Sequence, residues 1–357
     1  MGFVLLKKTL TQNIAVMATD ILLIGTGITG ALSAFHLKNS MPSVNISLWD
    51  EACGAGGRMS GSISPSDSNC AADIGAQYIT TNMKTMTKYK DIYEPLIRDG
   101  IIEGLTVTVL GMKKFEDESI RHFVAPRGMN SIVKYFLKDV PSRDVRFNTR
   151  VIAIDEEGGK LTVESEEGFG SFHAVVSTMP VPQFLQLSGS VPRHAADLTD
   201  LQNVAYSSRF ALVLFFAKDA QFPFPEWGCR YLDHPVFRYV SVDNVKRNRP
   251  EDPVSVMFHT SVKFGVENLE KTLPEMEKLL LGQARELFPD WPEPAAVKCH
   301  KWRFSQVVEP FPGKPGCLML NPSPVLVLGG DAFSESNFDG CIHSSLKIVE
   351  ALRESFP

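Results

Sequence analysis

Residues 21–30 read Ile-Leu-Leu-Ile-Gly-Thr-Gly-Ile-Thr-Gly, an apolar run followed by the glycine pattern G-x-G-x-x-G. The apolar run predicts a buried strand, and residues 28–38 predict the helix that follows it. Gly25 permits a tight strand-to-helix turn, Gly27 lets a pyrophosphate approach the backbone, and Gly30 lets the helix and strand pack closely. The N-terminus of the helix would face the phosphates. These residues predict a dinucleotide-binding βαβ unit.

An acidic residue stands where such a unit needs one. Asp50 lies twenty residues after Gly30, at the end of a second strand-like segment, 44–49. A carboxylate at this spacing accepts a hydrogen bond from a ribose hydroxyl of the bound nucleotide. Glycine patterns alone are common in turns, so the strand, the helix and the acid together carry the prediction.

The composition is that of an ordinary globular protein, with 44% hydrophobic and 22% charged residues. A length of 357 residues predicts about two domains. The net charge of −5 argues against nucleic acid and anionic membranes as partners. The longest apolar run, 210–217, is too short to span a bilayer. We therefore expect a monomer with a small-molecule substrate, no nucleic-acid partner and no membrane partner.

The cysteines of the chain are scattered singly. No C-x-x-C pair and no cysteine–histidine group with zinc spacing occurs, so we expect no metal site. Free thiols in a chain of this length suit a reducing compartment, which favours a cytoplasmic location. The six residues are Cys53, Cys70, Cys229, Cys299, Cys317 and Cys341.

Residues 1–17 form an N-terminal extension ahead of the first predicted strand. They include Lys7 and Lys8, but neither a long apolar core nor a small-residue cleavage site like that of a secretory signal. Leu6 excludes the myristoylation pattern. We expect a frayed extension or one that results from an alternative translation start at Met17, and a targeting role is the alternative.

The patterns along the chain divide it into two domains. Strand-like and helical runs alternate near both ends, whereas the middle is rich in strands, aromatic residues and prolines. This predicts an α/β fold in which a Rossmann-like cofactor domain carries an inserted α+β substrate domain, built on a mostly antiparallel sheet. The expected cofactor domain covers 18–82, 120–182 and 318–357, and the expected substrate domain covers 83–119 and 183–317.

Hydrophobic periodicity also predicts individual elements beyond the first unit. Two helices are expected at 129–138 and 273–287. The strand-like runs are 145–155, which opens a meander, and 174–178, 210–216, 237–242, 254–260 and 325–328.

Three further motifs favour FAD over a nicotinamide cofactor. One of them, 73–78, combines an acid, a glycine and a polar–aromatic pair, which a strand entry with a buried tyrosine would also explain. Gly57 would let its loop lie against the cofactor, and Arg58 would offer a cation to the diphosphate. Near the other end of the chain, Asp331 follows an apolar strand, and Gly340 and Cys341 open the last helix. A long dinucleotide needs such a second turn, because Asp331 would bind the ribityl chain while the helix N-terminus faced the flavin pyrimidine.

These motifs resemble the renalase family, FAD-dependent proteins related to the flavin amine oxidases and the aromatic hydroxylases. The resemblance extends over about 18–353. It is carried by the segments 49–50, 56–59, 73–79, 124–129, 178–182, 206–209, 241–244, 301–307 and 336–342. The glycine motifs are shared across the superfamily, whereas the aromatic and serine-rich segments are more particular to renalases.

The resemblance implies a cofactor domain like that of p-hydroxybenzoate hydroxylase, with FAD bound non-covalently. Carried over position by position, it implies flavin contacts at Thr29, Arg58, Gln77 and Tyr78. Ile342, which follows Cys341 in the last helix, is a further candidate cofactor contact. The resemblance also implies an oxidase that returns the 2- and 6-dihydro isomers of NAD(P)H to NAD(P)+ by hydride transfer to flavin N5. Dioxygen would reoxidise the flavin and give hydrogen peroxide.

Such a reaction asks little of protein side chains, because the lone pair of the ring nitrogen drives hydride loss without a general base. It needs a flat, partly apolar slot that holds the ring against the flavin. Our candidates for this slot are Tyr78, Tyr239, Asn244, His259 and Trp302. Each also has a structural interpretation, since strand aromatics are often core residues and asparagine is common in turns.

Charged residues near these candidates have their own expected partners. Lys301 and Arg303 flank Trp302 and would help to hold a nucleotide phosphate. Arg209, which follows two serines, would pair with an acidic loop residue.

Two other functions stay open at this point. The first is an amine oxidase acting on catecholamines, a chemistry that goes with an aromatic cage and, in many superfamily members, with a lysine near flavin N5, for which Lys263 is the candidate. The second is a secreted signalling protein whose FAD is only structural. The scattered cysteines and the missing signal core argue against secretion.

Overall fold

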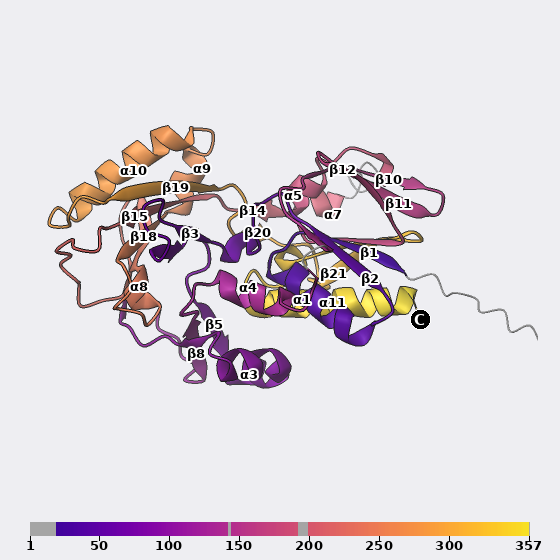
Figure 1. The fold of residues 1–357 in the computed structure, drawn as a ribbon, viewed down its shortest axis with the longest axis horizontal. Helices are drawn as coiled ribbons and strands as arrows, with labels where there is room; N and C mark the ends of the chain where they lie inside the picture. Colours follow the sequence, from indigo (N-terminus) through magenta and orange to yellow (C-terminus); the bar gives the residue numbers. More distant parts are fainter. Residues whose placement is uncertain (1–18, 142–143, 192–198, 357) are drawn as a thin grey trace, which may run out of the picture.

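The structure, a computed structural model, describes residues 19–141, 144–191 and 199–356. The predicted extension over 1–17 lies outside the described residues. Two sheet-containing lobes lie side by side along the longest axis, one carrying β1, β2 and α11 and the other carrying β15, β19 and α10 (Figure 1). The arrangement is mixed α/β, as predicted.

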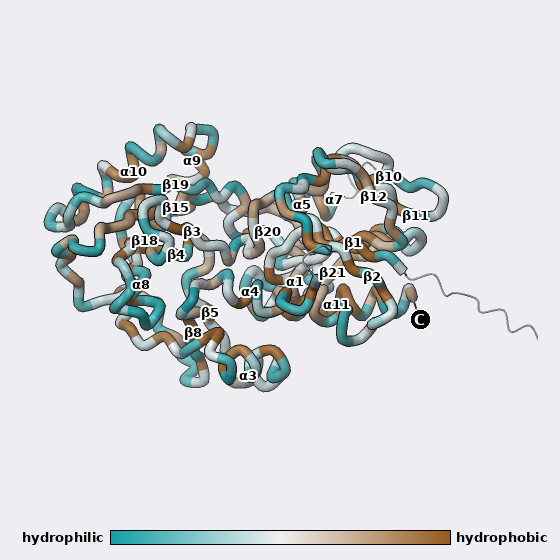
Figure 2. Tube along the Cα trace, in the orientation of Figure 1, coloured by the Kyte–Doolittle hydropathy of each residue, from teal (hydrophilic) through white to brown (hydrophobic). Residues whose placement is uncertain are grey.

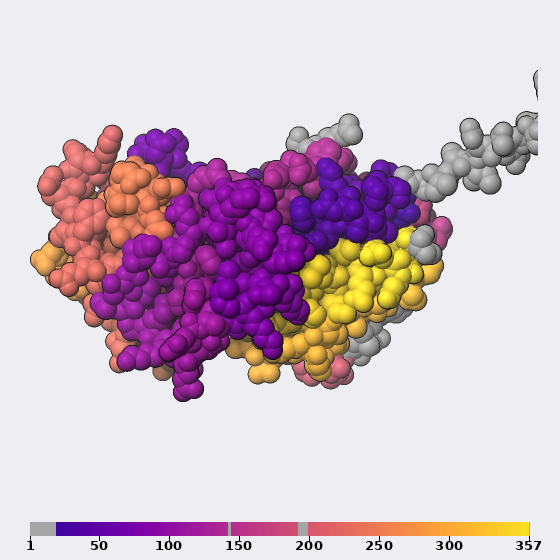
Figure 3. All heavy atoms as spheres, turned by 90° about the horizontal axis from the view of Figure 1, so that it is seen from below, coloured from indigo at the N-terminus to yellow at the C-terminus, as the bar shows by residue number. Residues whose placement is uncertain are grey.

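The first lobe contains a Rossmann-like sheet in the order β21-β22-β13-β1-β2-β9. Its strands are Cys317–Pro322 (β21), Val325–Gly329 (β22), Ala174–Ser177 (β13), Asp20–Ile24 (β1), Asn45–Trp49 (β2) and Val145–Arg146 (β9). All neighbouring pairs are parallel except β21 with β22. Strands from both ends of the chain therefore share one sheet, and the N-terminal and C-terminal segments are contiguous at the surface (Figure 3).

Alternating side chains of β1 cover the two faces of this sheet. Ile21 and Leu23 pack with the helices α1, α4 and α11, whereas Leu22 and Ile24 pack with a three-stranded antiparallel sheet. The bounds are Ile28–Ser40 (α1), Asn130–Leu137 (α4), Phe338–Ser355 (α11), Val151–Glu157 (β10), Lys160–Ser165 (β11) and Gly168–Phe172 (β12). The hydrophobic tube segments gather at these central strands (Figure 2).

The second lobe is built on a six-stranded sheet in the order β19-β15-β18-β17-β16-β7. Its pairs are antiparallel except β16 with β7. The strands are Ala296–Trp302 (β19), Arg209–Phe215 (β15), Ser255–Thr260 (β18), Phe237–Val242 (β17), Cys229–Tyr231 (β16) and Val109–Leu110 (β7). Helices α9 (Val262–Glu267) and α10 (Leu273–Leu287) cover one face (Figure 1). The opposite face is the one that bears on function.

The remaining elements that the structure describes are shorter. They are Gly57–Met59 (η1), Gly61–Ile63 (β3), Ala71–Asp73 (β4), Ile79–Asn82 (β5), Met83–Lys88 (α2), Lys90–Arg98 (α3), Glu103–Gly104 (β6), Ile120–Val124 (β8), Val181–Phe184 (α5), Thr199–Gln202 (α7), Ala205–Tyr206 (β14), Asp243–Lys246 (α8), Val307–Glu309 (β20) and Asp331–Phe333 (η3). Among the described residues, no helix is long and apolar enough to cross a membrane.

Candidate active site

The glycine turn after β1 has the geometry that its sequence predicts. Gly25 has a φ of +103° and donates its N–H to the carbonyl oxygen of Trp49 at 2.8 Å. A Cβ atom added to Gly30 would lie 2.0 Å from the oxygen of Gly25, so only glycine fits there. A Cβ added to Gly27 would meet only the Cα atom of Gly57, at 4.0 Å. The turn is therefore tight inside and open at Gly27, which fits the approach of a pyrophosphate.

The carboxylate of Asp50 lies beside this turn. Its Oδ2 accepts hydrogen bonds from the backbone N–H and hydroxyl of Thr26, at 2.6 and 2.7 Å, and its Oδ1 accepts from the N–H of Ala52 at 2.8 Å. These bonds fix the orientation of the carboxylate. They leave it acceptor capacity for a ribose hydroxyl, because two carboxylate oxygens together accept about four hydrogen bonds.

Arg58 and Asp331 form a bidentate ion pair, although 273 residues separate them in the chain. The two N···O distances are 2.7 and 2.6 Å, and Ser336 donates a further hydrogen bond to Asp331. Burial lowers the pKa of the Arg58 guanidinium, but the charge of Asp331 outweighs this and raises it. The pair joins the motif that we assigned to the diphosphate with the one that we assigned to the ribityl chain, while a third of the Arg58 side chain stays exposed.

The first turn of α11 packs against the first turn of α1. Asn337 caps α11 by accepting from the N–H of Gly340, and its carbonyl accepts from the N–H of Cys341. A Cβ added to Gly340 would lie 1.9 Å from the oxygen of Glu335. Burial raises the pKa of the Cys341 thiol to about 12, while the hydroxyl of Thr29 acts in the opposite sense. The cofactor contacts predicted at Gly340 and Cys341 thus depend on a tightly packed helix start, in which only glycine fits at position 340.

Ile342, a further predicted contact, is fully buried in the core between α1 and α11. Its side chain therefore anchors α11 in the core.

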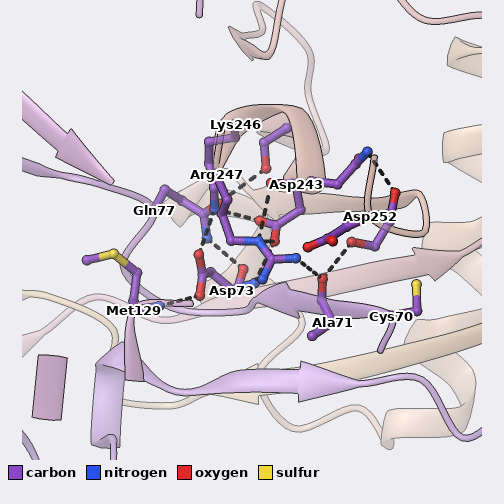
Figure 4. Close-up of polar contacts among 12 residues, drawn as sticks. Cys70, Ala71, Asp73, Gln77, Met129, Asp243, Lys246, Arg247 and Asp252 are labelled. Atoms are coloured by element: carbon purple, nitrogen blue, oxygen red, sulfur yellow. Dashed lines mark hydrogen bonds and ion pairs between the residues drawn. The ribbon is translucent and has the colours of Figure 1, made fainter. Parts of the chain in front are cut away.

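The segment 73–78 contacts a buried ionic cluster formed by Asp73, Asp243, Lys246 and Arg247 (Figure 4). Lys246 Nζ lies 3.0 Å from Asp73 Oδ2 and 2.5 Å from Asp243 Oδ1. Arg247 Nε lies 2.8 Å from Asp243 Oδ2. Burial disfavours the charge of Lys246, but the two carboxylates outweigh burial and raise its pKa. The cluster holds two positive and two negative charges, so it is neutral as a unit.

Gln77 is part of the same network. Its Nε2 donates to the carbonyl oxygens of Asp73 and Gly75, at 2.7 and 2.9 Å. Its Oε1 accepts from Lys246 Nζ at 3.0 Å and from Ser241 Oγ at 3.2 Å. The Gln77 side chain, which we predicted as a flavin contact, therefore holds the loop 73–78 in place through hydrogen bonds on its buried side. The sequence reasoning missed this cluster, although the acid–base spacing at 243–247 is the signal of a helix with paired charges.

The face of the second sheet that α9 and α10 leave uncovered carries an aromatic wall, formed by Tyr78, Tyr231, Tyr239, His259 and Trp302. These side chains come from four strands and from the segment after Gly75. The hydroxyls of Tyr78 and Tyr231 lie 2.6 Å apart, and the rings of Tyr231 and Tyr239 are 5.2 Å apart, edge to face. Burial and the Tyr231 hydroxyl raise the pKa of Tyr78 well above its ordinary value, so it stays protonated.

One backbone carbonyl joins the aromatic wall to the cofactor motifs. The oxygen of Ile74 accepts a hydrogen bond from Trp302 Nε1 and contacts His259 Nε2, both at 2.8 Å. A Cβ added to the next residue, Gly75, would lie 2.0 Å from the oxygen of Arg58 and 3.3 Å from the Trp302 ring. The loop 73–78 thus passes between Arg58 and the wall in direct contact with both.

Three of our sequence-based candidates lie elsewhere. Asn244 is fully buried on α8 and donates to the carbonyl oxygens of Pro250 and Asp252, so it holds that loop. Lys263 is exposed on α9, which covers the other face of the sheet. The prediction that Arg209 pairs with an acidic residue was wrong, because its guanidinium donates to the Thr260 carbonyl and the Gln306 side chain.

His259 is neutral at physiological pH. Burial lowers the pKa of His259 from 6.5 to about 4, although the hydrogen bond to Ile74 opposes the shift. The positive charge of Arg209 lowers the pKa further. As a neutral imidazole, His259 adds no charge to the aromatic wall.

No group of three or more histidine, cysteine or acidic side chains with a metal-binding arrangement occurs in the described ranges.

The lowered pKa of His259 predicts a stability that depends on pH. Below pH 6.5 the unfolded chain takes up a proton that the folded protein refuses until about pH 4, so stability falls as the pH decreases through this window. We expect protonation of His259 in the unfolded chain to lower the free energy of unfolding by about 2 kcal/mol between pH 7 and pH 5. Denaturant unfolding of wild type and His259→Gln at both pH values measures this loss. Equal losses in the two proteins would contradict the assignment.

Comparisons with known proteins agree with this architecture. Residues 102–352 match the family model of the flavin containing amine oxidoreductases, and residues 23–94 match that of the NAD(P)-binding Rossmann-like domain. Renalase from Mus musculus is 38% identical over 340 residues, which are 93% of this chain and 98% of the relative.

A solved structure shares the fold. The protein, from Exiguobacterium sp. 255-15 and named as a candidate protoporphyrinogen oxidase, superimposes with a TM-score of 0.71. The match covers 94% of this chain and 99% of that one at 12% identity, and so speaks to the fold alone. From the flavin-oxidoreductase model over most of its length and the near-complete match to a renalase, we conclude that this chain belongs to the renalase family of flavin-dependent oxidoreductases.

Proposed function

We propose that this protein is an FAD-dependent oxidase that converts the 2- and 6-dihydro isomers of NAD(P)H to NAD(P)+. The substrate gives up a hydride, with its electron pair, from a ring carbon. Dioxygen then takes up these two electrons, the proton of the hydride and one further proton from solvent to give hydrogen peroxide. The observation that carries the proposal is the aromatic wall joined through the Ile74 carbonyl to the loop beside Arg58. An aromatic wall next to the cofactor motifs suits a planar ring that needs no general base.

The proposed cofactor is non-covalent FAD, in a domain arranged like that of p-hydroxybenzoate hydroxylase. When bound, FAD supplies N5 as the hydride acceptor and the route by which electrons reach dioxygen. Gly27 leaves open backbone for the diphosphate, Asp50 accepts from the ribose, and the Arg58–Asp331 pair contributes a charged edge. Because burial raises the pKa of Cys341 to about 12, the thiolate needed for a covalent link is scarce at neutral pH.

The side chains of the wall hold and orient the substrate ring. His259 is neutral and Tyr78 stays protonated, so neither places a charge next to the cation formed when the dihydropyridine loses a hydride. The hydrogen bonds to Ile74 hold Trp302 in place, which keeps its ring at contact distance from Gly75. A rigid slot of this kind places the reacting carbon in line for transfer.

Anaerobic mixing of the flavin-loaded protein with candidate substrates tests the proposal. We expect the isomeric dihydro-NAD(P) species to bleach the flavin rapidly, and dopamine to leave its visible absorbance unchanged. Readmitted oxygen should restore the absorbance and release one hydrogen peroxide per flavin.

Bleaching by dopamine, with none by the dihydro isomers, would overturn the proposal in favour of an amine oxidase. The exposed position of Lys263 on α9 argues against that alternative, because α9 covers the face of the sheet opposite the aromatic wall. If no reductant of either class bleaches the flavin, the cofactor is structural.

We also propose a cytoplasmic location. All six cysteines lie in described parts of the chain and all are free thiols, three of them buried. Secreted proteins of this size usually oxidise such thiols into disulfides. A thiol titration of protein recovered from cells and from medium distinguishes this location from secretion, which the relatedness to renalase leaves as the alternative.

A further inference from the structure

Two arginines, Arg209 and Arg238, lie at one edge of the aromatic wall. Arg209 begins β15, where it pairs across the strands with Trp302 of the wall. Arg238 lies in β17 with its guanidinium 5.5 Å from the ring centre of Tyr231. Both positions are at the strand ends, next to the row that contains His259 and Tyr239.

Backbone geometry draws the two arginines together. Arg209 donates to the carbonyl oxygen of Thr260 at 3.2 Å, and Thr260 is the register partner of Phe237. The register then shifts between Phe237 and Tyr239, so that Arg238 is the extra residue of an irregularity in the ladder. Bulges of this kind redirect a side chain and are frequent beside active sites.

Neither arginine has a carboxylate within ion-pair distance among the described residues. Their hydrogen bonds reach only neutral groups, the Thr260 carbonyl and Gln306 amide for Arg209 and the Leu232 carbonyl for Arg238. Burial and then the charge of Arg238 lower the pKa of Arg209, so the two cations repel each other. Arg209 is partly buried and Arg238 is exposed, so an anion can reach the pair from solvent and balance its charge.

The cations that flank Trp302 in the sequence are, by contrast, already engaged. Lys301 donates to the carbonyl oxygens of Leu269 and Lys271, and Arg303 forms an ion pair with Glu270 at 3.0 Å. The side chains of Lys301 and Arg303, which we predicted to hold a nucleotide phosphate, are therefore already paired with groups of the protein.

We propose that Arg209 and Arg238 form the subsite for the diphosphate of the dinucleotide substrate, at the rim of the aromatic wall. Two guanidinium groups bind a diphosphate well, because each offers paired N–H donors that match phosphate oxygens. The inference rests on the proposed function, since it assigns the distal half of the same substrate. It makes these arginines specificity-determining residues that distinguish a dinucleotide from a free nicotinamide riboside.

Isothermal titration of ADP-ribose into the flavin-loaded protein tests the subsite without turnover. ADP-ribose carries the diphosphate but has no ring to oxidise. We expect Arg209→Met and Arg238→Met each to weaken its binding about 10- to 100-fold, the range for a lost charge-assisted hydrogen bond. Arg209→Lys should recover part of the affinity. The matched control is Arg230→Met, because Arg230 is exposed on β16 between two residues that face the wall and so points the other way.

Steady-state kinetics supply the second readout. The double variant Arg209→Met, Arg238→Met should raise KM for the dihydro dinucleotide isomers, with kcat and the KM for dihydronicotinamide riboside unchanged. Flavin content and melting temperature identify a variant that has lost its fold. If the double variant binds ADP-ribose with wild-type affinity, the proposed subsite is wrong. It is also wrong if the wild-type protein does not bind ADP-ribose. If ADP-ribose binding is lost as expected but no dihydro isomer is oxidised, the subsite stands and the proposed reaction fails.

Discussion

Gly27→Ala is expected to yield a folded protein that has lost its flavin. The added methyl group meets only Gly57 Cα at 4.0 Å, so the fold can accept it, but it occupies the space through which a diphosphate approaches the backbone. Gly30→Ala should be more severe, because its Cβ would lie 2.0 Å from the Gly25 oxygen and must push α1 away from β1. The ratio of flavin to protein absorbance after purification measures both.

Gly54→Ala is the matched control for these two variants. It lies in the loop before Gly57, and an added Cβ there meets no atom within 4 Å. Its flavin content should equal that of wild type. Full flavin occupancy in Gly27→Ala, together with a wild-type melting temperature, would refute the assignment of the glycine turn to the cofactor.

Lys246→Met is expected to destabilise the protein by about 3–5 kcal/mol, the range for removal of one partner from a buried ion pair. Lys246 is fully buried and neutralises both Asp73 and Asp243, so its loss leaves two carboxylates facing one arginine in a dry interior. Methionine keeps a similar shape, which separates the effect of charge from that of packing. Urea unfolding of the flavin-loaded protein measures the loss.

Lys347→Met provides the comparison. Lys347 also forms an ion pair with an acidic residue three positions away, Glu350, but its side chain is 43% exposed. Such a pair contributes about 0–1 kcal/mol. Losses of similar size in the two variants would show that the buried cluster does not carry the stability that we ascribe to it.

Elements with strong local signals could be predicted from the sequence. The expected helix over 273–287 matches α10 at both ends, because Thr272 and Glu275 form a capping box and the chain leaves the helix at Phe288. The glycine turn also has the predicted form, since its requirements are local to a few residues.

Features that depend on distant residues could not be predicted. The run 145–155 was expected as one strand, yet Asn148 with a φ of +52° divides it. Residues 145–146 join the parallel sheet, and 151–157 open a separate antiparallel one. The pairing of Arg58 with Asp331 and the convergence of His259 and Trp302 on Ile74 likewise arise from tertiary contacts, which hydrophobic periodicity does not encode.

The sheet that combines both ends of the chain has a consequence for biosynthesis. β22 pairs with β13, and the acid that holds Arg58 follows β22 directly. A ribosome that has translated the first 300 residues has therefore made the glycine turn, but still lacks the strand and helix that complete the sheet around it. On the proposed assignment of the site, cofactor loading must wait until β22 and α11 have been synthesised. Every messenger truncated before β22 would yield a chain without a complete flavin site, which exposes such products to quality control.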